Sequence, residues 1–551
     1  MKKLLFLLII SCFFGCKSEK DSEKIEAGNT AYNEASEIEK QQAHENERMR
    51  FKLIQSKVDR GDMWKPFQKD LQNFGEEAYN TLKPQIIEKD ILAIQQQIKE
   101  GKLTYKELVL FYLYRIHKYE SNPNISLYSI ISLNKNVVEE AEEKDRLFQQ
   151  NKNIPNQIFG MPILLKDNIG TIGMPTTAGA VALLENYTDD AFITKRLKEK
   201  GALILGKANL SEWAYYFCDG CPLGYSAIGG QTLNPYGRKI FESGGSSSGS
   251  GAVTAVNYAV AAVGTETAGS ILSPSSQNSV VGLKPTVGLL SRSGIVPISS
   301  TLDTPGPMTK NVTDNAILLD AMLGKDQLDV ASVEMDVNFF KELKNISADT
   351  IKLGALKSLM EGDTIYLKTI QKLKEIGFQI VEIEAPNVEL NGFLTLLNID
   401  MKNDLPAYLD AYASKEVTVK NIQEIIDFNL KDSVIREPYK QALFDGIVSD
   451  TTTIEQLEVV KDSLQFNGRQ FFEPTFSKYK VDAVLSINNY HAAYAAVAKY
   501  PALAMPMGYK KSGEPISLTF IALPFQEQLL LQLGYIFEQE LPVRKLPQNY
   551  E

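Results

Sequence analysis

The sequence predicts a large α/β domain in which a central mixed β-sheet is covered by helices on both faces. An apolar run at residues 163–165 precedes apolar residues at helical spacing over 192–200. Gly201 then gives a stop signal, and a second apolar run follows at 202–205. The same strand–helix–strand order returns over residues 353–383. Because alternating strands and helices form parallel or mixed sheets with helices packed on them, this is the architecture we expect.

The composition supports one large globular domain over residues 86–548. Hydrophobic residues make up 44% and charged residues 23% of the 551-residue chain, which excludes a disordered chain, a collagen and a disulfide scaffold. No proline-rich or glycine/serine linker divides residues 86–548. The net charge of −10 argues against a nucleic-acid partner, since such proteins usually carry a basic excess.

Histidine is scarce in this chain. The 3 histidines are His44, His117 and His491. Chemistry that needs several histidines, such as a histidine-rich metal site, has almost no place here, and a histidine-based triad is disfavoured.

The first sixteen residues resemble a bacterial lipoprotein signal. Residues 1–3 (Met-Lys-Lys) form a positive segment, and residues 4–14 are an apolar run broken only by Ser11 and Cys12, too short to span a bilayer as a helix. We predict a signal peptide over residues 1–15, with a lipid-modified Cys16 as the first mature residue. The protein would then be lipid-anchored in a bacterial cell envelope, in the periplasm or at the outer-membrane surface, with membrane contact through the lipid alone. An ordinary cleaved signal peptide is the alternative.

A polar segment follows the signal. Residues 17 to about 60 are rich in Glu, Lys, Gln, Asn and Ser and poor in aromatic residues. Such a stretch buries too little apolar area to offset its ordering entropy. We therefore predict a polar tether and an N-terminal helical region over residues 17–85, ahead of the domain.

One segment departs from ordinary composition. Residues 243–252 read SGGSSSGSGA, and residues 264–271 and 281–286 add further glycines and hydroxyl groups. Glycines let backbone N–H groups converge on an anion, and serines donate and accept hydrogen bonds together. A flexible linker has a similar composition. The apolar, strand-like runs on both sides favour a buried site loop.

These segments resemble the amidase signature hydrolases. The resemblance covers about residues 86–545, and its most specific block is residues 244–286. Supporting blocks occur in the family's order at residues 160–168, 206–213 and 303–308. The resemblance implies the family's α/β fold and amide hydrolysis without a metal or cofactor.

The resemblance also assigns roles to single residues. It implies Ser270 as the nucleophile, Ser246 as the bridging serine after a cis peptide bond, and Lys166 as the base. The implied oxyanion hole consists of the backbone N–H groups of Thr267, Ala268, Gly269 and Ser270.

These roles agree with side-chain chemistry. A serine hydroxyl is a poor nucleophile unless a neighbour takes its proton. Burial lowers the pKa of a lysine from about 10.4, so Lys166, which follows an apolar run, can be neutral. Ser246 can accept a proton from Ser270 while it donates its own to Lys166. We therefore expect activity that rises into the alkaline range.

Three residues differ from the commoner family pattern. Glu266 replaces an aspartate, Ala268 replaces a glycine, and Leu272 stands where arginine is frequent. Alanine keeps its N–H but disfavours positive φ, so these departures bear on the oxyanion hole and leave the nucleophile in place.

Three other blocks look most like the peptide amidase branch. They are residues 229–236, 245–249 and 288–292. The predicted substrate is therefore the C-terminal amide of a peptide, cleaved to acid and ammonia, and a fatty-acyl or small aliphatic amide is the alternative. Residues 385–500 are expected to cover the pocket.

Two other serine motifs compete with this interpretation. Ser132-x-x-Lys135, with Lys511-Ser-Gly, fits a penicillin-binding protein or β-lactamase, but Ser132 follows a strand-like run and no Ser-Asp-Asn lies between the motifs. Residues 245–249 fit the nucleophile elbow G-x-S-x-G, which would make Ser247 the nucleophile and His491 its base. The Gly/Ser composition alone explains that match.

Cys218 and Cys221 form a C-x-x-C motif that is open to several interpretations. It fits a redox pair, half of a zinc site, a tight disulfide or two reduced cysteines. No second C-x-x-C or histidine pair completes a zinc site.

Two further function classes remain beside an amidase. One is a non-catalytic surface lipoprotein that binds an amide or peptide, against which the intact set of Lys166, Ser246 and Ser270 argues. The other is a transamidase subunit that acts on charged tRNA, against which the export signal argues.

Overall fold

The computed structural model describes residues 32–151 and 154–551, and a mixed β-sheet lies at its centre. Within these residues the sheet has 11 strands. In spatial order they are β1 (Ile130–Leu133), β3 (Leu203–Ala208), β2 (Pro162–Lys166), β6 (Ala261–Glu266), β8 (Thr304–Thr309), β7 (Val281–Lys284), β12 (Ala502–Tyr509), β13 (Pro515–Ile521), β11 (Ala483–Ile487), β9 (Lys352–Leu356) and β10 (Gln379–Ile383). A separate ribbon pairs β4 (Tyr225–Ser226) with β5 (Gly230–Gln231).

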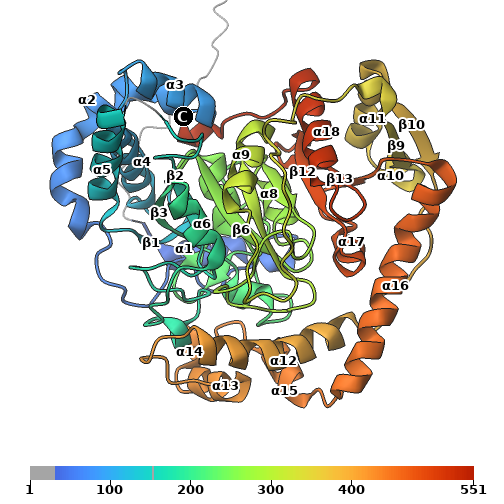
Figure 1. Cartoon of the computed structure of the whole chain (residues 1–551). Helices are drawn as coiled ribbons and strands as arrows, with labels where there is room; N and C mark the ends of the chain where they lie inside the picture. The colour runs from blue at the N-terminus through green and yellow to red at the C-terminus, as the bar shows by residue number, and fades with distance from the viewer. Residues whose placement is uncertain (1–31, 152–153) are drawn as a thin grey trace, which may run out of the picture. The chain divides into compact units, whose positions relative to one another are not determined.

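Helices surround this sheet (Figure 1). They are α1 (Glu34–Gln41), α2 (Gln68–Ile86), α3 (Ile91–Lys99), α4 (Tyr105–Glu120), α5 (Val137–Asn151), α6 (Phe192–Glu199), α7 (Ser248–Ala255), α8 (Leu272–Gln277), α9 (Val312–Met322), α10 (Lys357–Gly362), α11 (Thr364–Ile376), α12 (Phe393–Ala411), α13 (Ile422–Leu430), α14 (Ser433–Arg436), α15 (Ala442–Ser449), α16 (Ile454–Tyr479), α17 (Ala492–Ala498) and α18 (Glu527–Glu540). Within the described part of the chain, none of them combines the length and apolar character of a membrane span.

Strand β12 shows that helices cover both faces of the sheet. Leu503 contacts α18, where a Cβ added at Gly534 would come within 2.6 Å of its side chain. The next residue, Ala504, packs instead in a hydrophobic cluster with Leu272 of α8. Because successive side chains of a strand point to opposite faces, α8 and α18 lie on opposite sides of the sheet. The predicted α/β fold class is confirmed.

The strand order brings the ends of β2 and β6 together. These strands are parallel neighbours, with Leu165 opposite Val263. Both therefore end at the same edge of the sheet, β2 at Lys166 and β6 at Glu266. The residues after β6 lead into α8, and α7 packs over the same strands. This edge is where the candidate site lies.

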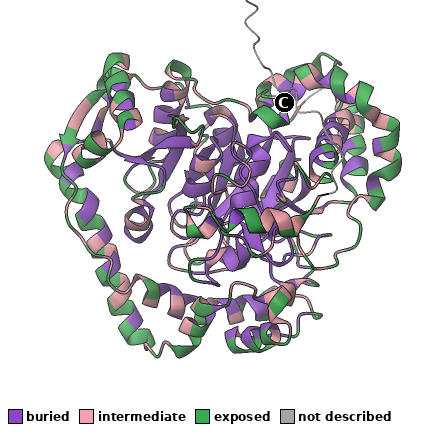
Figure 2. Ribbon diagram, turned by 180° about the vertical axis from the view of Figure 1, so that it is seen from behind, coloured by how far each residue is buried: buried purple, intermediate pink, exposed green. Residues whose placement is uncertain are grey.

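The segment from α12 to α16 forms a helical layer of its own beside the sheet, drawn in orange in Figure 1. It contributes to a second hydrophobic cluster that includes Leu405, Tyr408 and Phe444 together with Trp213. Figure 2 shows the contrast in burial: the sheet is almost wholly buried, whereas these helices alternate buried and exposed positions.

The prediction of a tether up to about residue 60 is wrong from residue 34 onward. Residues Glu34–Glu551 form one compact unit, and Met49, Phe51 and Ile54 are buried in the main core. The carbonyl of Ile54 also accepts a hydrogen bond from Gln231 N at 2.8 Å. A few well-spaced apolar residues therefore anchor a polar segment, and the domain begins well before residue 86. The predicted signal peptide and Cys16 lie outside the described residues.

Candidate active site

Lys166 ends β2 with its side chain fully buried. Its Nζ lies 2.8 Å from Ser246 Oγ. Two further contacts join Nζ to Thr265, at 2.8 Å from Oγ1 and 3.2 Å from the carbonyl oxygen. Lys166 is thus surrounded by neutral oxygen atoms rather than by a directly bonded carboxylate.

Burial lowers the pKa of Lys166 from its ordinary value of 10.5 to about 7, although the charges of Asp303 and Glu266 oppose that shift. A neutral amine has two N–H donors and one lone pair. The two oxygens of Thr265 suit the donors, which leaves the lone pair for the hydroxyl of Ser246. The geometry therefore fits a lysine that receives a proton from Ser246.

Ser246 lies in the loop before α7 and is fully buried. The Gly245–Ser246 peptide bond is cis, at the position where the family resemblance places one. The carbonyl of Ser246 accepts a hydrogen bond from Ser211 N at 3.0 Å. The next residue, Ser247, donates its N–H to the carbonyl of Ser270 at 3.1 Å. The structure thus places Lys166 and Ser246 in direct contact and ties Ser270 to the backbone beside them.

Residues 267–270 form the turn between β6 and α8. Asp303 accepts a hydrogen bond from Thr267 Oγ1 at 2.6 Å and holds the start of the turn. The carboxylate of Glu266 accepts from the N–H groups of Ile271 and Leu272, at 2.6 and 2.9 Å, and holds its end.

The turn supplies the N–H groups that the resemblance implies for the oxyanion hole, those of Thr267, Ala268, Gly269 and Ser270. Asp303 and Glu266 hold the two ends of that turn. Glu266, one of the departures from the common pattern, is the residue that braces this turn.

Sequence reasoning assigned no role to several residues that shape the site. Asn168 Nδ2 donates to Thr265 Oγ1 at 3.0 Å and so fixes the threonine that contacts Lys166. Asp303 fixes Thr267. Asn168, Thr265 and Asp303 all lie inside the sequence blocks that resemble the amidase signature hydrolases. Their position in those blocks is the one sequence feature that could have pointed to the site.

The competing serine–histidine arrangement is not assembled. Ser247 Oγ donates to the carbonyl of Thr265 at 3.0 Å and accepts from its N–H at 3.2 Å, so its hydroxyl is bound to backbone. His491 Nδ1 instead lies 2.6 Å from Ser486 Oγ. Burial lowers the pKa of His491 to about 4. Ser132 lies in strand β1, as its sequence context predicted.

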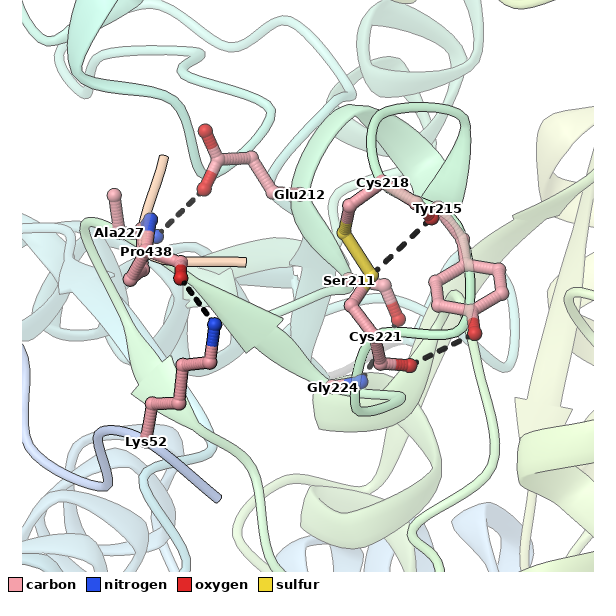
Figure 3. Close-up of a disulfide and its surroundings, with 9 residues drawn as sticks. All are labelled: Lys52, Ser211, Glu212, Tyr215, Cys218, Cys221, Gly224, Ala227 and Pro438. Carbon is pink, nitrogen blue, oxygen red and sulfur yellow. Dashed lines mark hydrogen bonds between the residues drawn. A yellow bond between two sulfur atoms is a disulfide. The ribbon is translucent and has the colours of Figure 1, made fainter. Parts of the chain in front are cut away.

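Cys218 and Cys221 form a disulfide, which decides between the alternatives left open by the sequence. Figure 3 shows it beside Ser211 and Gly224. Tyr215 OH donates to the carbonyl of Cys221 at 2.8 Å, and Gly224 N donates to Ser211 Oγ at 2.8 Å. The disulfide closes residues 218–221, which lie between Gly224 and Ser211, the residue whose N–H binds the Ser246 carbonyl. Over residues 32–151 and 154–551, no three His, Cys, Asp or Glu side chains are grouped to hold a metal.

Comparison with known proteins shows the family of this chain. The family model described as Amidase matches residues 107–456. A probable amidase of Arabidopsis thaliana is 35% identical over 480 residues, which cover 84% of this chain and 92% of the relative. The fold and these matches place the protein among the enzymes that hydrolyse amides.

Two solved structures are similar over most of the chain. An amidase family protein from Bacillus anthracis superposes with a TM-score of 0.84 and 36% identity, over 90% of this chain and 99% of that one. The native peptide amidase from Stenotrophomonas maltophilia superposes with a TM-score of 0.78 and 32% identity, over 84% and 99% of the two chains. The chain therefore belongs to the amidase signature family.

Proposed function

We propose that the protein hydrolyses a carboxamide C–N bond through a triad of Ser270, Ser246 and Lys166, with an acyl-enzyme on Ser270. The observation that carries the proposal is the fully buried contact of 2.8 Å between Lys166 Nζ and Ser246 Oγ. Such a contact has a direct chemical use, because a neutral lysine can hold the proton that a serine nucleophile must lose.

Acylation begins when Ser270 Oγ attacks the carbonyl carbon of the amide. The proton of Ser270 passes to Ser246 Oγ, while the proton of Ser246 passes to Lys166 Nζ. The carbonyl oxygen becomes an oxyanion, which backbone N–H groups of the turn after β6 stabilise by ~3–4 kcal/mol per donor. The C–N bond then breaks, and the leaving nitrogen receives a proton from Lys166 through Ser246.

Deacylation repeats these steps with water in place of Ser270. A water molecule gives a proton to the Ser246–Lys166 pair and attacks the acyl carbon. The ester bond to Ser270 breaks, Ser270 recovers its proton, and the carboxylic acid leaves. The products are one acid and one ammonia or amine for each amide consumed.

The C-terminal amide of a peptide is the substrate class that we propose. The similarity to the peptide amidase from Stenotrophomonas maltophilia supports it, as do the blocks at residues 229–236 and 288–292. The test is ammonia release by residues 17–551 from three matched sets: peptide amides, fatty-acyl amides and small aliphatic amides. We expect the highest kcat/KM for peptide amides and no release by Ser270→Ala.

The same panel separates the alternatives. Preference for fatty-acyl or small aliphatic amides would replace the substrate class and keep the reaction. Binding of peptide amides without ammonia release from any set would instead indicate a non-catalytic binding lipoprotein. An unchanged rate in Ser270→Ala would overturn the proposed triad.

We also propose that the mature protein is anchored in a bacterial cell envelope by a lipid on Cys16. The apolar run over residues 4–14, followed by Gly15 and Cys16, supports this location. Labelled palmitate should enter the full-length protein expressed in a bacterium and should not enter Cys16→Ala. Equal labelling of the two proteins would exclude Cys16 as the lipidated residue.

A further inference from the structure

A cavity of about 330 Å³ lies beside the turn between β6 and α8. Thr265 and Thr267 line one side of it, and residues of α12 line another. Thr265 is the residue bonded to Lys166 Nζ, so the cavity opens next to the proposed catalytic groups. At roughly 30 Å³ for each water-sized group, it holds a fragment of about ten non-hydrogen atoms.

The walls of this cavity are mainly apolar. Ile295, Ile298, Pro305, Val330, Tyr408 and Tyr412 are among its lining residues. A small number of polar groups stand out against these walls. An apolar cavity with a few placed polar groups is the usual form of a site for a small ligand, because the polar groups fix its orientation.

Most charged groups in the cavity already have partners. Arg292 binds Asp329 through an ion pair and also donates to the carbonyl of Ser300. Asp303 accepts from Thr267 Oγ1 at 2.6 Å and from the N–H groups of Ile298 and Ser299 at 2.8 and 2.9 Å. These groups build the wall and leave little capacity for a ligand.

Asp404 of α12 is different. Its Oδ2 accepts one backbone hydrogen bond, from Ser300 N at 2.6 Å. Within the described part of the chain no lysine or arginine forms an ion pair with it. Burial raises the pKa of Asp404 to about 6, and the nearby carboxylates of Asp400 and Asp303 add to that rise. Above that pH the cavity contains a half-buried carboxylate without an ion pair of its own. The charge of Arg292 acts on it, but that guanidinium is paired with Asp329.

A second acceptor lies at the catalytic end of the cavity. Asn168 lines it and is 2% exposed. Its Nδ2 donates to Thr265 Oγ1 and to the carbonyl of Val296, whereas no described residue donates to its Oδ1. A buried acceptor without a donor is costly, so an N–H group is the complement that it needs. Both ends of the cavity therefore call for a ligand that supplies N–H groups.

We propose that this cavity is the subsite for the acyl side of the substrate and that Asp404 binds a free ammonium group there. The inference deepens the proposed amide hydrolysis and rests on it. It narrows the substrate class to amino-acid or short peptide amides with an unblocked amino group. Asn168 Oδ1 accepts a substrate N–H nearer to the reacting carbonyl.

The test compares glycyl-leucinamide with N-acetylglycyl-leucinamide, in which an acetyl group removes this charge. Ammonia release gives kcat/KM for each at pH 7, where Asp404 is mostly ionised and the free amino group, with a pKa of about 8, is mostly protonated. We expect the wild-type protein to prefer the free amine. In Asp404→Asn we expect kcat/KM for the free amine to fall roughly 10- to 100-fold, because one charged hydrogen bond is lost, with the acetylated substrate unchanged.

Asp410→Asn is the matched control, since Asp410 lies on the same helix and is exposed. It should change neither rate. Asparagine at residue 404 can still accept from Ser300 N, so the variant keeps its local fold. Equal wild-type rates on the two substrates, or an equal fall of both in Asp404→Asn, would overturn the role of Asp404. Those results leave the triad intact, whereas activity retained by Ser270→Ala would remove the proposed reaction itself.

Discussion

Lys166 Nζ lies 2.8 Å from Ser246 Oγ, and neither side chain is exposed to solvent. A charged ammonium is unfavourable in such a place, because no carboxylate is bonded to it and water cannot reach it. The contact therefore links two properties of the site. The burial that lowers the pKa of Lys166 also keeps the transferred proton away from bulk water.

The pH dependence of activity follows from this contact. Lys166 acts as a base only when neutral, and its pKa is about 7. Below that pH the protonated fraction grows, so we expect kcat/KM to fall about tenfold per pH unit, and above about pH 8 we expect it to level off. The measurement is kcat/KM from pH 5 to 9 on an uncharged amide. A flat profile would exclude Lys166 as the base.

A second buried lysine offers a control for that profile. The pKa of Lys284 is also lowered by burial, to about 8, but its Nζ donates to the carbonyls of Pro285 and Tyr500. Lys166→Met should lower kcat about 10²–10⁴-fold, the usual contribution of a general base. Lys284→Met should keep the fall of kcat/KM below about pH 7. If that fall disappears in Lys284→Met and remains in Lys166→Met, the titrating group is Lys284 and not Lys166.

The choice of nucleophile is the second prediction. We expect Ser270→Ala to lose at least about 10³-fold in kcat, since removal of a nucleophile disables the whole catalytic unit. Ser247→Ala should keep most of its activity and lose stability, because Ser247 Oγ donates a hydrogen bond to the carbonyl of Thr265 and accepts one from its N–H. Circular dichroism melting would separate the two effects. The reverse pattern would favour the nucleophile-elbow interpretation.

Much of this site could be predicted from the sequence, because its residues lie in short segments of distinctive composition. Lys166 ends an apolar strand and Ser246 and Ser270 lie in glycine-rich segments, which indicated a buried site loop, and the resemblance to the amidase signature hydrolases assigned the three roles. Strands such as β2 and β9 and helices such as α11 were likewise predictable from apolar spacing. The packing of these elements follows general rules, which is why the fold class could be predicted.

Long-range relationships could not be predicted in the same way. Asp404 meets Ser300 across more than a hundred residues of chain, and nothing in the local pattern of α12 singles it out. The segment after residue 34 looked like a tether because its mean composition is polar. Three apolar residues, Met49, Phe51 and Ile54, decide its position by fitting a surface that exists only in the folded protein.

The third prediction concerns the close approach of α7 to the sheet. A Cβ added at Gly264 in β6 would meet Met308 Sδ at 2.7 Å and Ser247 Oγ at 2.8 Å. Because Ser247 adjoins Ser246, we expect Gly264→Ala to lower the free energy of unfolding by about 1–3 kcal/mol and to lower kcat as well. Urea denaturation and ammonia release measure the two effects.

Gly446→Ala is the matched control for that substitution. Gly446 lies in α15, and an added Cβ would meet nothing within 4 Å. Alanine there should raise stability by up to about 1 kcal/mol, its helix-propensity advantage over glycine. An unchanged kcat in Gly264→Ala would show that the close packing of Gly264 against Ser247 is not needed to position Ser246.

The disulfide gives the last prediction. Cys218 and Cys221 close a short ring in the loop that starts at Ser211, whose N–H binds the Ser246 carbonyl. Replacing both cysteines with serine should lower the free energy of unfolding by about 2 kcal/mol, the loop-closure entropy of so short a ring, and should lower kcat more than it raises KM.

A reductant provides the control for that substitution. Cys218 and Cys221 are the only cysteines after residue 16, so a reductant acting on residues 17–551 reaches this bond alone. It should reproduce the effect in the wild-type protein and leave the double variant unchanged. Equal sensitivity of the two proteins would show that the loop holds Ser246 without the bond.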